Sequence, residues 1–462
     1  MKSLFNETFV FGKENLLNHV RIGKIKDKFL LTTDHGAWIL VNKEEFDKIK
    51  QNKFNEEEFK LLEEKGIILT KNNTNQIIDL YKKRYNFLFH GAGLHIIVPT
   101  PRCNHRCIYC HASAVCSDEK EQDMTQETAT KILDFIFQTP AKTITIEFQG
   151  GDALLNVDVF KFVVNSALEM NKTHKKEMDF ALVTNLTLMT DELMQFCIDK
   201  EVNVCTSLDG PQHVHDANRK YINGSSHEHV VKWIKKFNEH GKKVGALMVT
   251  TKNSLSFYKE IVDEYVNLEI PLIQIKYMSS LGFAKEIDGY SVEEFIEFWK
   301  KSLLYIIELN KKGINIKERG TAIILQKLLT PFDAGHLDFR SPCGICSGQI
   351  CYNFDGSIYG CDEGRCYDLF KVGSVFKDNY EDIFKKEETQ QLIKASMLEN
   401  YLCDACVYKP YCGTCIVNNY ADYGSLLPKL NKDKCLMRKK MFDYVFELLM
   451  DVSTRDVLVG WI

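Results

Sequence analysis

The sequence predicts an α/β fold built on a partial barrel of six β/α units, with a smaller module at each end. Three observations predict it. Between residues 94 and 312, six short apolar runs are each followed by a helical pattern, which is typical of parallel strands joined by crossover helices. Residues 19–70 indicate short strands followed by helices, and the chain beyond residue 340 is loop-rich and dense in cysteine.

The N-terminal module is expected over residues 1–75. Strand-like alternation occupies residues 19–33 and 37–41, a helical pattern follows over 44–66, and a last strand covers 67–70. The polar stretch KNNTNQ then reads as a linker, and the helix-like segment IIDLYKKRYNFLF leads to the barrel. We assign residues 76–92 to this linker helix.

The barrel is expected over residues 93–315. Its predicted strands are 94–100, 143–149, 179–185, 203–209, 244–250 and 272–278, and its predicted helices lie near 127–138, 157–172, 190–201, 227–241, 256–268 and 291–312. In barrels of this kind the reactive groups collect at the C-terminal ends of the strands. Residues 316–445 should form a loop-rich cysteine domain, and residues 446–462 a C-terminal tail.

Composition excludes several classes of partner. The 462 residues carry 59 basic and 63 acidic side chains that are well mixed, so no basic surface for nucleic acid is expected. No run of 18 apolar residues occurs, and Asn6, Glu7 and Lys13 interrupt the apolar N-terminus. We therefore expect a cytoplasmic protein with neither a membrane nor a nucleic-acid partner.

Sixteen cysteines are more than packing requires, and a chain of this length needs no disulfides to stay folded. Metal binding is the better explanation, because fourteen of them fall into three groups. The groups are Cys103, Cys107, Cys110 and Cys116; Cys343, Cys346, Cys351, Cys361 and Cys366; and Cys403, Cys406, Cys412, Cys415 and Cys435.

The first group begins directly after the first barrel strand, in the segment CNHRCIYC. The spacing of Cys103, Cys107 and Cys110 lets one loop place three thiolates around an iron–sulfur cluster. Three ligands for four irons leave one iron open to a small molecule. The alternative is a zinc site with His105 or His111 as the fourth ligand.

A CxxxCxxC loop after the first strand of a β/α barrel resembles the radical S-adenosylmethionine (SAM) superfamily. The resemblance implies a [4Fe–4S] cluster whose open iron binds SAM, with reductive cleavage of SAM to a 5′-deoxyadenosyl radical. Other strand ends agree with it: Gly150, Gly151 and Asp152 resemble the family's GGE motif, with Asp in place of Glu. The resemblance further places Asn185, Ser207 and Asp209 near the ribose and methionine groups, Arg219 on the SAM carboxylate, and Tyr109 against the adenine. Each residue alone has an ordinary alternative as a turn, a strand end or a solvated side chain.

The C-terminal cysteines Cys403-x2-Cys406-x5-Cys412-x2-Cys415, followed by Cys435, resemble the SPASM extension of radical SAM peptide-modifying enzymes. The third spacing is two residues here, where that family usually has three. The resemblance implies one auxiliary [4Fe–4S] cluster on Cys403, Cys406, Cys412 and Cys435. A second cluster would use Cys415, Cys361 and two of Cys343, Cys346 and Cys351. A pair of zinc ribbons is the alternative for this region.

Longer segments, among them ITIEFQGGD and SPCGICSGQICYNFDGSIYGCDE, resemble the maturases of the His-Xaa-Ser peptide system. The segment 343–366 is richer in cysteine than that group's pattern. The resemblance implies an enzyme that modifies a ribosomally made precursor peptide, using a low-potential electron donor such as flavodoxin or ferredoxin. It also implies a winged-helix-like N-terminal module that takes the peptide's leader by strand addition, although a simple structural cap is the alternative.

Asp362 follows Cys361 at the position where sulfatase-maturing relatives have a carboxylate base, so the resemblance implies a proton acceptor there; an exposed loop acid is the alternative. Two rival functions remain. An anaerobic sulfatase-maturating, formylglycine-generating enzyme would share the barrel, the auxiliary clusters and this Asp. A non-catalytic iron–sulfur or zinc scaffold that presents peptides would have lost the SAM-site residues, which are present.

Overall fold

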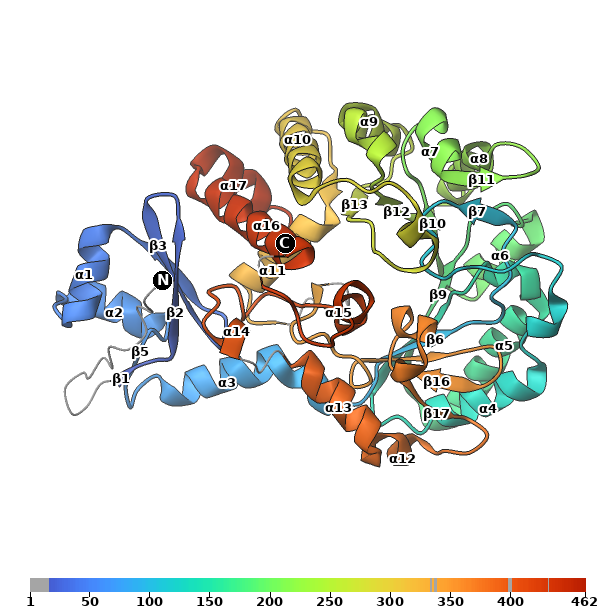
Figure 1. Cartoon of the computed structure of the whole chain (residues 1–462), viewed down its shortest axis with the longest axis horizontal. Helices are drawn as coiled ribbons and strands as arrows, with labels where there is room; N and C mark the ends of the chain where they lie inside the picture. Colours follow the sequence, from blue (N-terminus) through green and yellow to red (C-terminus); the bar gives the residue numbers. More distant parts are fainter. Residues whose placement is uncertain (1–15, 333–334, 336–338, 398–400, 431) are drawn as a thin grey trace.

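The computed structural model describes residues 16–332, 335, 339–397, 401–430 and 432–462. Its centre is a sheet of ten strands in the order β14-β13-β12-β10-β9-β8-β6-β15-β16-β17 (Figure 1). The strands are β6 Leu94–Ile97, β8 Thr143–Phe148, β9 Glu177–Val183, β10 Val202–Ser207, β12 Gly245–Val249, β13 Leu272–Lys276, β14 Lys317–Glu318, β15 Gln349–Tyr352, β16 Ser357–Tyr359 and β17 Lys371–Ser374. From β14 to β15 every neighbouring pair is parallel.

The six predicted barrel strands are all present, and consecutive ones are neighbours in the sheet. This winding in a single direction is typical of a barrel, whereas an open doubly wound sheet would reverse its strand order. The sheet stays open between β14 and the hairpin of β16 and β17, so the predicted α/β fold with a partial barrel is confirmed.

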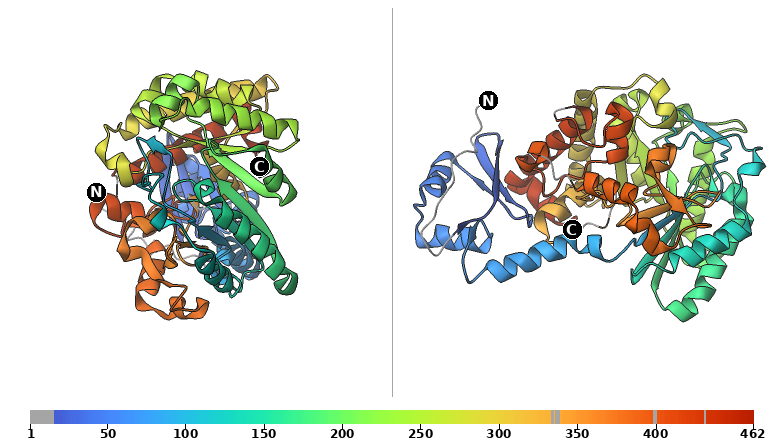
Figure 2. Two further views of the ribbon diagram at one scale, coloured as in Figure 1. Left: turned by 90° about the vertical axis from the view of Figure 1, so that its right-hand side faces the viewer. Right: turned by 60° about the horizontal axis from the view of Figure 1, so that its bottom comes forward.

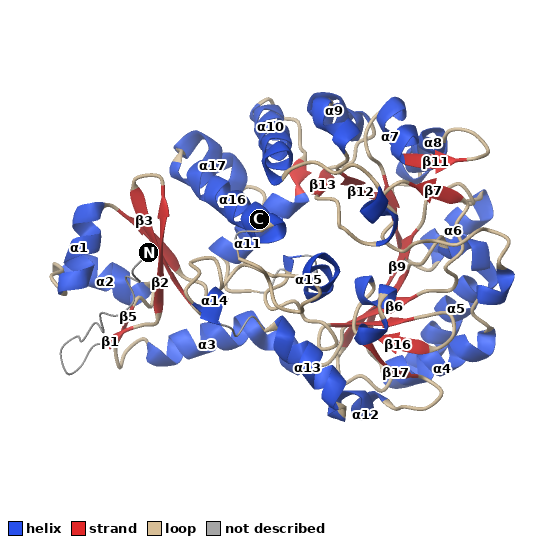
Figure 3. Cartoon of the chain, viewed as in Figure 1, coloured by secondary structure: helices blue, strands red, loops and turns tan. Residues whose placement is uncertain are grey.

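Helices cover the outside of this sheet (Figure 3). They are α4 Gln126–Ile136, α5 Val157–His174, α6 Asp191–Asp199, α7 Gln212–Asn218, α8 Ser226–Glu239, α9 Tyr258–Asn267, α10 Val292–Lys311 and α11 Arg319–Leu329. Four of them begin at a Ser or Thr whose hydroxyl accepts the third helical N–H, the usual N-cap: Thr125, Thr190, Ser225 and Ser291. The sequence analysis missed α7 and the short ribbon of β7 His105–Cys107 with β11 Arg219–Tyr221.

The N-terminal module has a three-stranded antiparallel sheet of β2 Val20–Ile25, β3 Lys28–Thr33 and β4 Trp38–Val41. Two helices with complete capping boxes, α1 Lys43–Gln51 and α2 Glu56–Glu64, close a small core of their own. The strand pair of β1 Leu16–Leu17 and β5 Ile68–Leu69 follows, and α3 Thr74–Tyr85 runs from the module to the barrel (Figure 2). The first fifteen residues of the predicted module lie outside the described residues.

The C-terminal region shares one hydrophobic core with the barrel. After the β15–β17 hairpin come α12 Tyr380–Lys385, α13 Glu387–Ser396, α14 Tyr401–Asp404, α15 Ile416–Tyr423, α16 Asp433–Met450 and α17 Val452–Val459. In residues 446–462, the predicted tail, α16 ends and α17 packs against α10, where the Trp461 indole donates to Asn310 at 2.7 Å. In the part of the chain that the structure describes, no helix has the length and apolarity needed to cross a bilayer.

Candidate functional site

A cavity of about 1130 Å³ extends from the interior of the barrel to the C-terminal ends of its strands. One wall carries strand-end residues, including Asn185 after β9 and Ser207 at the end of β10. The facing wall comes from the C-terminal region and carries Cys343, Cys361 and Cys415. The cavity therefore lies between two cysteine-bearing parts of the chain, as expected if both serve one site.

Cys103, Cys107 and Cys110 all line this cavity. The ribbon of β7 and β11 sets Cys107 directly opposite Arg219, whose guanidinium lies 3.9 Å from the Cys107 sulfur. Burial raises the pKa of the Cys103 thiol to about 12 and that of Cys107 to about 11. These thiols are therefore protonated at neutral pH by themselves, and become thiolates only with a cationic partner such as iron.

Gly150 and Gly151 bring the end of β8 against the segment that leads into the cysteine loop. A Cβ at Gly151 would lie 2.0 Å from the Arg102 carbonyl oxygen, and one at Gly150 would lie 2.4 Å from that of Thr100. The Asp152 amide donates to the Arg102 carbonyl at 2.7 Å. Both glycines line the cavity, and their lack of a side chain is what lets this backbone hold the cysteine loop in place.

Asp152 lies behind the cavity wall, with 1% of its surface exposed. Its carboxylate accepts from the Thr184 hydroxyl at 2.9 Å, the Asn185 amide at 2.8 Å and the Leu154 amide at 3.0 Å. The side chain of Asn185, in turn, donates to Asn104 in the cysteine loop at 2.8 Å. Asp152 thus positions Asn185, because the turn after β8 directs its carboxylate toward β9.

Asp209 is also fully buried and gathers the side chains around Arg219. It accepts from Arg219 Nε at 3.3 Å, from Asn218 at 3.2 Å and from the Tyr109 hydroxyl. The Arg219 guanidinium lies 5.1 Å from the centroid of the Tyr109 ring, within cation–π range. Tyr109 and Arg219 line the cavity, so this trio presents a guanidinium and an aromatic ring to it.

Two histidines of the cysteine loop have separate surroundings. His105 is buried, bonded to Ser226 Oγ at 2.9 Å and stacked on Tyr221. His111 faces the cavity and lies 3.2 Å from the Asp362 carboxylate. Sequence reasoning gave neither contact, because both partners are more than 100 residues away.

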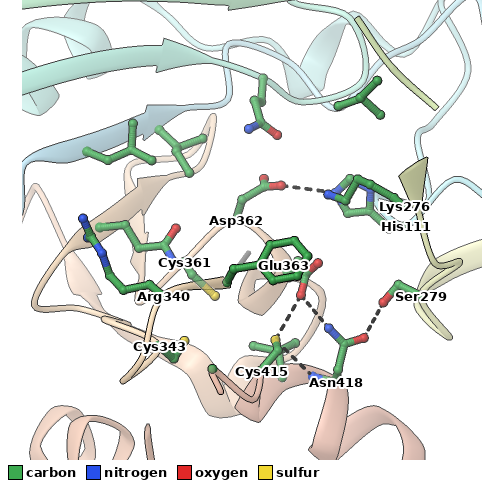
Figure 4. A pocket seen from close by; sticks show the side chains of 18 of the residues that line it. His111, Lys276, Ser279, Arg340, Cys343, Cys361, Asp362, Glu363, Cys415 and Asn418 are labelled. Atoms are coloured by element: carbon green, nitrogen blue, oxygen red, sulfur yellow. Dashed lines mark hydrogen bonds and ion pairs between the residues drawn. The ribbon is translucent and has the colours of Figure 1, made fainter. Parts of the chain in front are cut away.

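Asp362 joins the two walls of the cavity (Figure 4). Besides His111 it binds Arg365 Nε at 2.9 Å. Burial raises the pKa of Asp362, but Arg365 and His111 outweigh burial and hold that pKa well below its usual value. Asp362 is therefore ionised at neutral pH and buried, so the alternative of an exposed loop acid is wrong.

Glu363 was missed by the sequence analysis and lies on the C-terminal wall. Its carboxylate accepts from the Cys415 thiol at 3.1 Å and from the Asn418 amide at 2.8 Å. Asn418 also accepts from Ser279 of the barrel, so this network links the two halves of the cavity, as Figure 4 shows. The adjacency of Glu363 to Asp362 after Cys361 was the only available signal.

The cysteines of the second group, together with Cys415 of the third group, divide between two positions. Cys343, Cys361 and Cys415 lie on the cavity wall, and the negative charge of Cys343 contributes to the raised pKa of Cys346, although burial contributes more. Cys351, on β15, is fully buried and its surroundings include Asp362, Arg365 and Cys366. The Cys346 amide donates to the Gly360 carbonyl at 3.0 Å, which places Cys346 beside Cys361, whereas Cys351 does not line the cavity.

A second cavity of about 30 Å³, smaller and less open than the first and called the closed cavity below, lies between α16 and the loop after α14. All four cysteines predicted for one auxiliary cluster line it: Cys403, Cys406, Cys412 and Cys435. Leu430, Phe442 and Tyr408 also line it, and the lining is completed by Lys409, Thr414, Pro428, Arg438 and Lys439.

These donor sets consist of thiols, which suit iron–sulfur clusters. All sixteen cysteines are free of disulfides, and thiolates are the ligands that such clusters require.

Comparison with known proteins gives a consistent result. Residues 97–268 match the family model of the Radical SAM superfamily. A cysteine-type anaerobic sulfatase-maturating enzyme of Clostridium novyi (strain NT) is 23% identical over 322 residues, which cover 67% of this chain and 83% of that protein.

Two solved structures have similar folds. Native anSMEcpe with bound AdoMet has a TM-score of 0.68 at 21% identity, covering 78% of this chain and 99% of its own. Streptococcus suis SuiB bound to the precursor peptide SuiA has a TM-score of 0.54 at 16% identity, covering 89% of this chain and 98% of its own. The second match extends over more of this chain than the first.

Proposed function

We propose that this chain, whose residues 97–268 form a radical SAM domain, is an enzyme that modifies a ribosomally made precursor peptide by hydrogen abstraction. The observation that carries the proposal is the placement of three cysteines, Cys103, Cys107 and Cys110, on the wall of a cavity that is large enough for SAM and a peptide segment. A site with three thiols and free space beside them suits a cluster that must also bind a small molecule.

The proposed cofactors are one SAM-binding [4Fe–4S] cluster, two auxiliary [4Fe–4S] clusters and SAM. With SAM bound and an electron supplied by flavodoxin or ferredoxin, the first cluster would provide reductive cleavage to methionine and a 5′-deoxyadenosyl radical. The protein's own share is to bind, orient and exclude water.

The residues around the cysteine loop have distinct proposed tasks. Arg219 would pair with the SAM carboxylate through its planar guanidinium, which Asp209 and Tyr109 hold in place. Asn185 and Ser207 would bind the ribose and methionine groups from the strand ends, and Tyr109 would contact the adenine. Gly150, Gly151 and Asp152 would support these groups by fixing the cysteine loop and Asn185.

For the auxiliary clusters we propose Cys403, Cys406, Cys412 and Cys435 as one ligand set. Cys343, Cys346, Cys361 and Cys415 form the other, which leaves Cys351 as a buried thiol. Three members of this second set, Cys343, Cys361 and Cys415, lie on the cavity wall, where a cluster would be placed to accept the electron that remains on a substrate radical.

Asp362 is the proposed proton acceptor. It is ionised, which is the form a base needs, although the neighbours that lower its pKa also weaken its basicity. Asp362→Asn would keep the size of the side chain and remove the charge. If Asp362 is the base, turnover of the peptide falls by about 100-fold or more while SAM cleavage continues; unchanged turnover would remove the assignment.

The N-terminal module is proposed to take the peptide's leader along an edge of its three-stranded sheet. The similarity to SuiB, solved with its precursor peptide, supports this because that match covers 89% of the chain. We place the enzyme in the cytoplasm, where peptide precursors and low-potential donors occur.

A sulfatase-maturating activity is the second candidate. It is favoured by the similarity to the Clostridium novyi enzyme, which covers 83% of that protein. The two candidates separate in a direct assay: a synthetic sulfatase segment with its Cys or Ser would gain a formylglycine only if the second is correct.

The test of radical SAM activity is anaerobic reconstitution, followed by iron and sulfide counts and an assay for 5′-deoxyadenosine with dithionite. Two or three four-iron clusters require roughly 8 to 12 irons. Wild type should form 5′-deoxyadenosine and Cys107→Ala should not. Zinc in place of iron, or iron without SAM cleavage, would contradict the proposal and leave the non-catalytic scaffold.

A further inference from the structure

The N-terminal module rests on the loop that carries three of the cysteines of the closed cavity. This 403–412 loop, defined by Cys403 and Cys412, offers two backbone carbonyls to the module's sheet. Arg21 Nε donates to the Asp404 carbonyl at 2.6 Å, and the Thr32 hydroxyl donates to the Val407 carbonyl at 2.7 Å.

These contacts are buried. Arg21 is 2% exposed and Thr32 is 0% exposed, and an ion pair of 2.7 Å with Asp34 holds the Arg21 guanidinium in position. A Cβ at Gly23 would lie 2.7 Å from Val407 Cγ1, so the backbone of β2 lies directly on the Val407 side chain. Breaking a buried hydrogen bond leaves an unsatisfied polar group, so this interface is held firmly when the loop is in place.

A second set of contacts fixes the other end of the same loop. The Tyr411 hydroxyl donates to the Gly36 carbonyl at 3.1 Å, in the turn between β3 and β4. Arg84 of α3 donates to the Pro410 carbonyl at 3.4 Å and to the His35 carbonyl at 3.0 Å. The module therefore contacts the 403–412 loop from its sheet and from a turn, and the connecting helix α3 contacts it as well.

The loop itself has little regular structure to fix it. Between the end of α14 at Asp404 and the start of α15 at Ile416, its internal backbone bonds are turns, such as Cys406 to Cys403 at 2.9 Å and Cys412 to Tyr408 at 2.8 Å. The carbonyls that accept from the module belong to Asp404 and Val407, each adjacent to a cysteine. A cluster bound by those cysteines would fix the same backbone.

We propose that the cluster held by Cys403, Cys406, Cys412 and Cys435 docks the N-terminal module onto the barrel, with Arg21 and Thr32 as positioning residues. Presentation of a peptide by the module is then conditional on loading of this cluster. That last consequence rests on the proposed function, whereas the docking itself does not. Linkage makes the effect reciprocal: if the cluster stabilises docking, docking stabilises the cluster to the same extent.

The first experiment measures hydrogen exchange of the full chain after reconstitution, comparing wild type with Cys412→Ser. Loss of the cluster should raise amide exchange in β2 and β3 by about tenfold or more, the usual size of such coupling, and leave β9 and β10 unchanged. Unaltered protection of β2 and β3 in a Cys412→Ser protein that lacks four irons would overturn the proposal.

The second experiment keeps every cysteine and changes the N-terminal module instead. It therefore tests the proposal even if Cys412→Ser fails to fold. Gly23→Val should force β2 away from Val407, and Thr32→Val removes the donor to its carbonyl at nearly constant volume. Both should release iron from one cluster to a chelator several-fold faster than wild type. Gly289→Val is the matched control, because a Cβ there meets nothing within 4 Å. Release rates equal to this control would overturn the proposal.

Neither readout involves SAM cleavage. A protein that shows the coupling and makes no 5′-deoxyadenosine contradicts only the proposed function. A protein that makes 5′-deoxyadenosine with no coupling contradicts only the docking.

Discussion

The two best-defined cysteine groups differ in number and in the space around them. Cys103, Cys107 and Cys110 lie on the wall of a cavity of about 1130 Å³, whereas Cys403, Cys406, Cys412 and Cys435 surround one of about 30 Å³. Three thiols with free space suit a cluster that binds a reactant, and four thiols in a closed shell suit one that holds the chain together. On the proposed function, the same residue type would serve chemistry in one region and architecture in the other.

The largest expected effect comes from removing one cysteine from each of the two groups in turn and comparing the two variants. Cys107→Ala should abolish 5′-deoxyadenosine formation and change the unfolding temperature little. Cys412→Ala should instead lower the unfolding temperature by at least about 10 °C, because structural metal sites contribute folding free energy directly. Calorimetry and the SAM cleavage assay on both variants check this.

If both variants lost stability equally, the distinction between an open catalytic site and a closed structural one would fail. Cys116→Ala is the control, since that exposed cysteine lines neither cavity.

A smaller effect is expected from Arg219→Lys, which tests whether SAM binding in the large cavity requires Arg219 as well as the three cysteines. Lysine keeps the charge and loses the planar fork, its bond to Asp209 and its contact over Tyr109. The KM for SAM should rise by about 10- to 100-fold with the iron content unchanged.

Lys220→Ala is the matched control, because Lys220 is the exposed neighbour of Arg219 on the same strand. A KM for SAM that stays at the wild-type value in Arg219→Lys would remove Arg219 from the SAM site.

The smallest expected effect is a dependence of folding stability on pH, caused by a buried histidine near the large cavity. His215 is buried beside Asp209, whose amide donates to its Nδ1 at 3.2 Å, and burial lowers the pKa of His215 well below 6.5. The unfolded chain takes up a proton below about pH 6.5 and the folded chain does not, so stability present at higher pH is lost as the pH falls. Burial of the neutral His215 should therefore lower the free energy of unfolding by about 1.4 kcal/mol at pH 5.5 relative to pH 7.5.

Unfolding of wild type and His215→Asn at the two pH values measures that share, since the variant should lose less stability between them. Equal losses of stability in the two proteins would show that His215 does not contribute to the pH dependence. None of the described residues that line the closed cavity is a histidine, so its exchange protection should change less over this range.

Local patterns predicted most of the barrel and the cysteine groups. The six strands and their helices follow from apolar periodicity, and Cys403, Cys406, Cys412 and Cys435 meet in one cavity as the motif indicated. Contacts between distant segments were beyond such reasoning. Asp152 turns toward Thr184, and His111 meets Asp362 across 251 residues, because the packing of separate elements determines both.

The same limit explains the β7–β11 ribbon. Each of its strands has three residues, too few for a periodic signal, and the pairing of Arg219 with Cys107 depends on the fold around them. Similarly, the resemblance placed Glu363 next to a candidate base but gave no reason to expect its bond to Cys415.

The pairing of β6 with β15 has a consequence for how the chain is made. Leu94 of the first barrel strand lies beside Gln349, which leaves the ribosome about 250 residues later. At usual rates of synthesis that is a delay of roughly 10 to 50 s, during which an apolar strand edge at Ile96 and Ile97 waits for its neighbour. A nascent chain of this kind exposes that edge until β15 has been made, and a cluster held by Cys403, Cys406, Cys412 and Cys435 could be completed only after Cys435 has emerged.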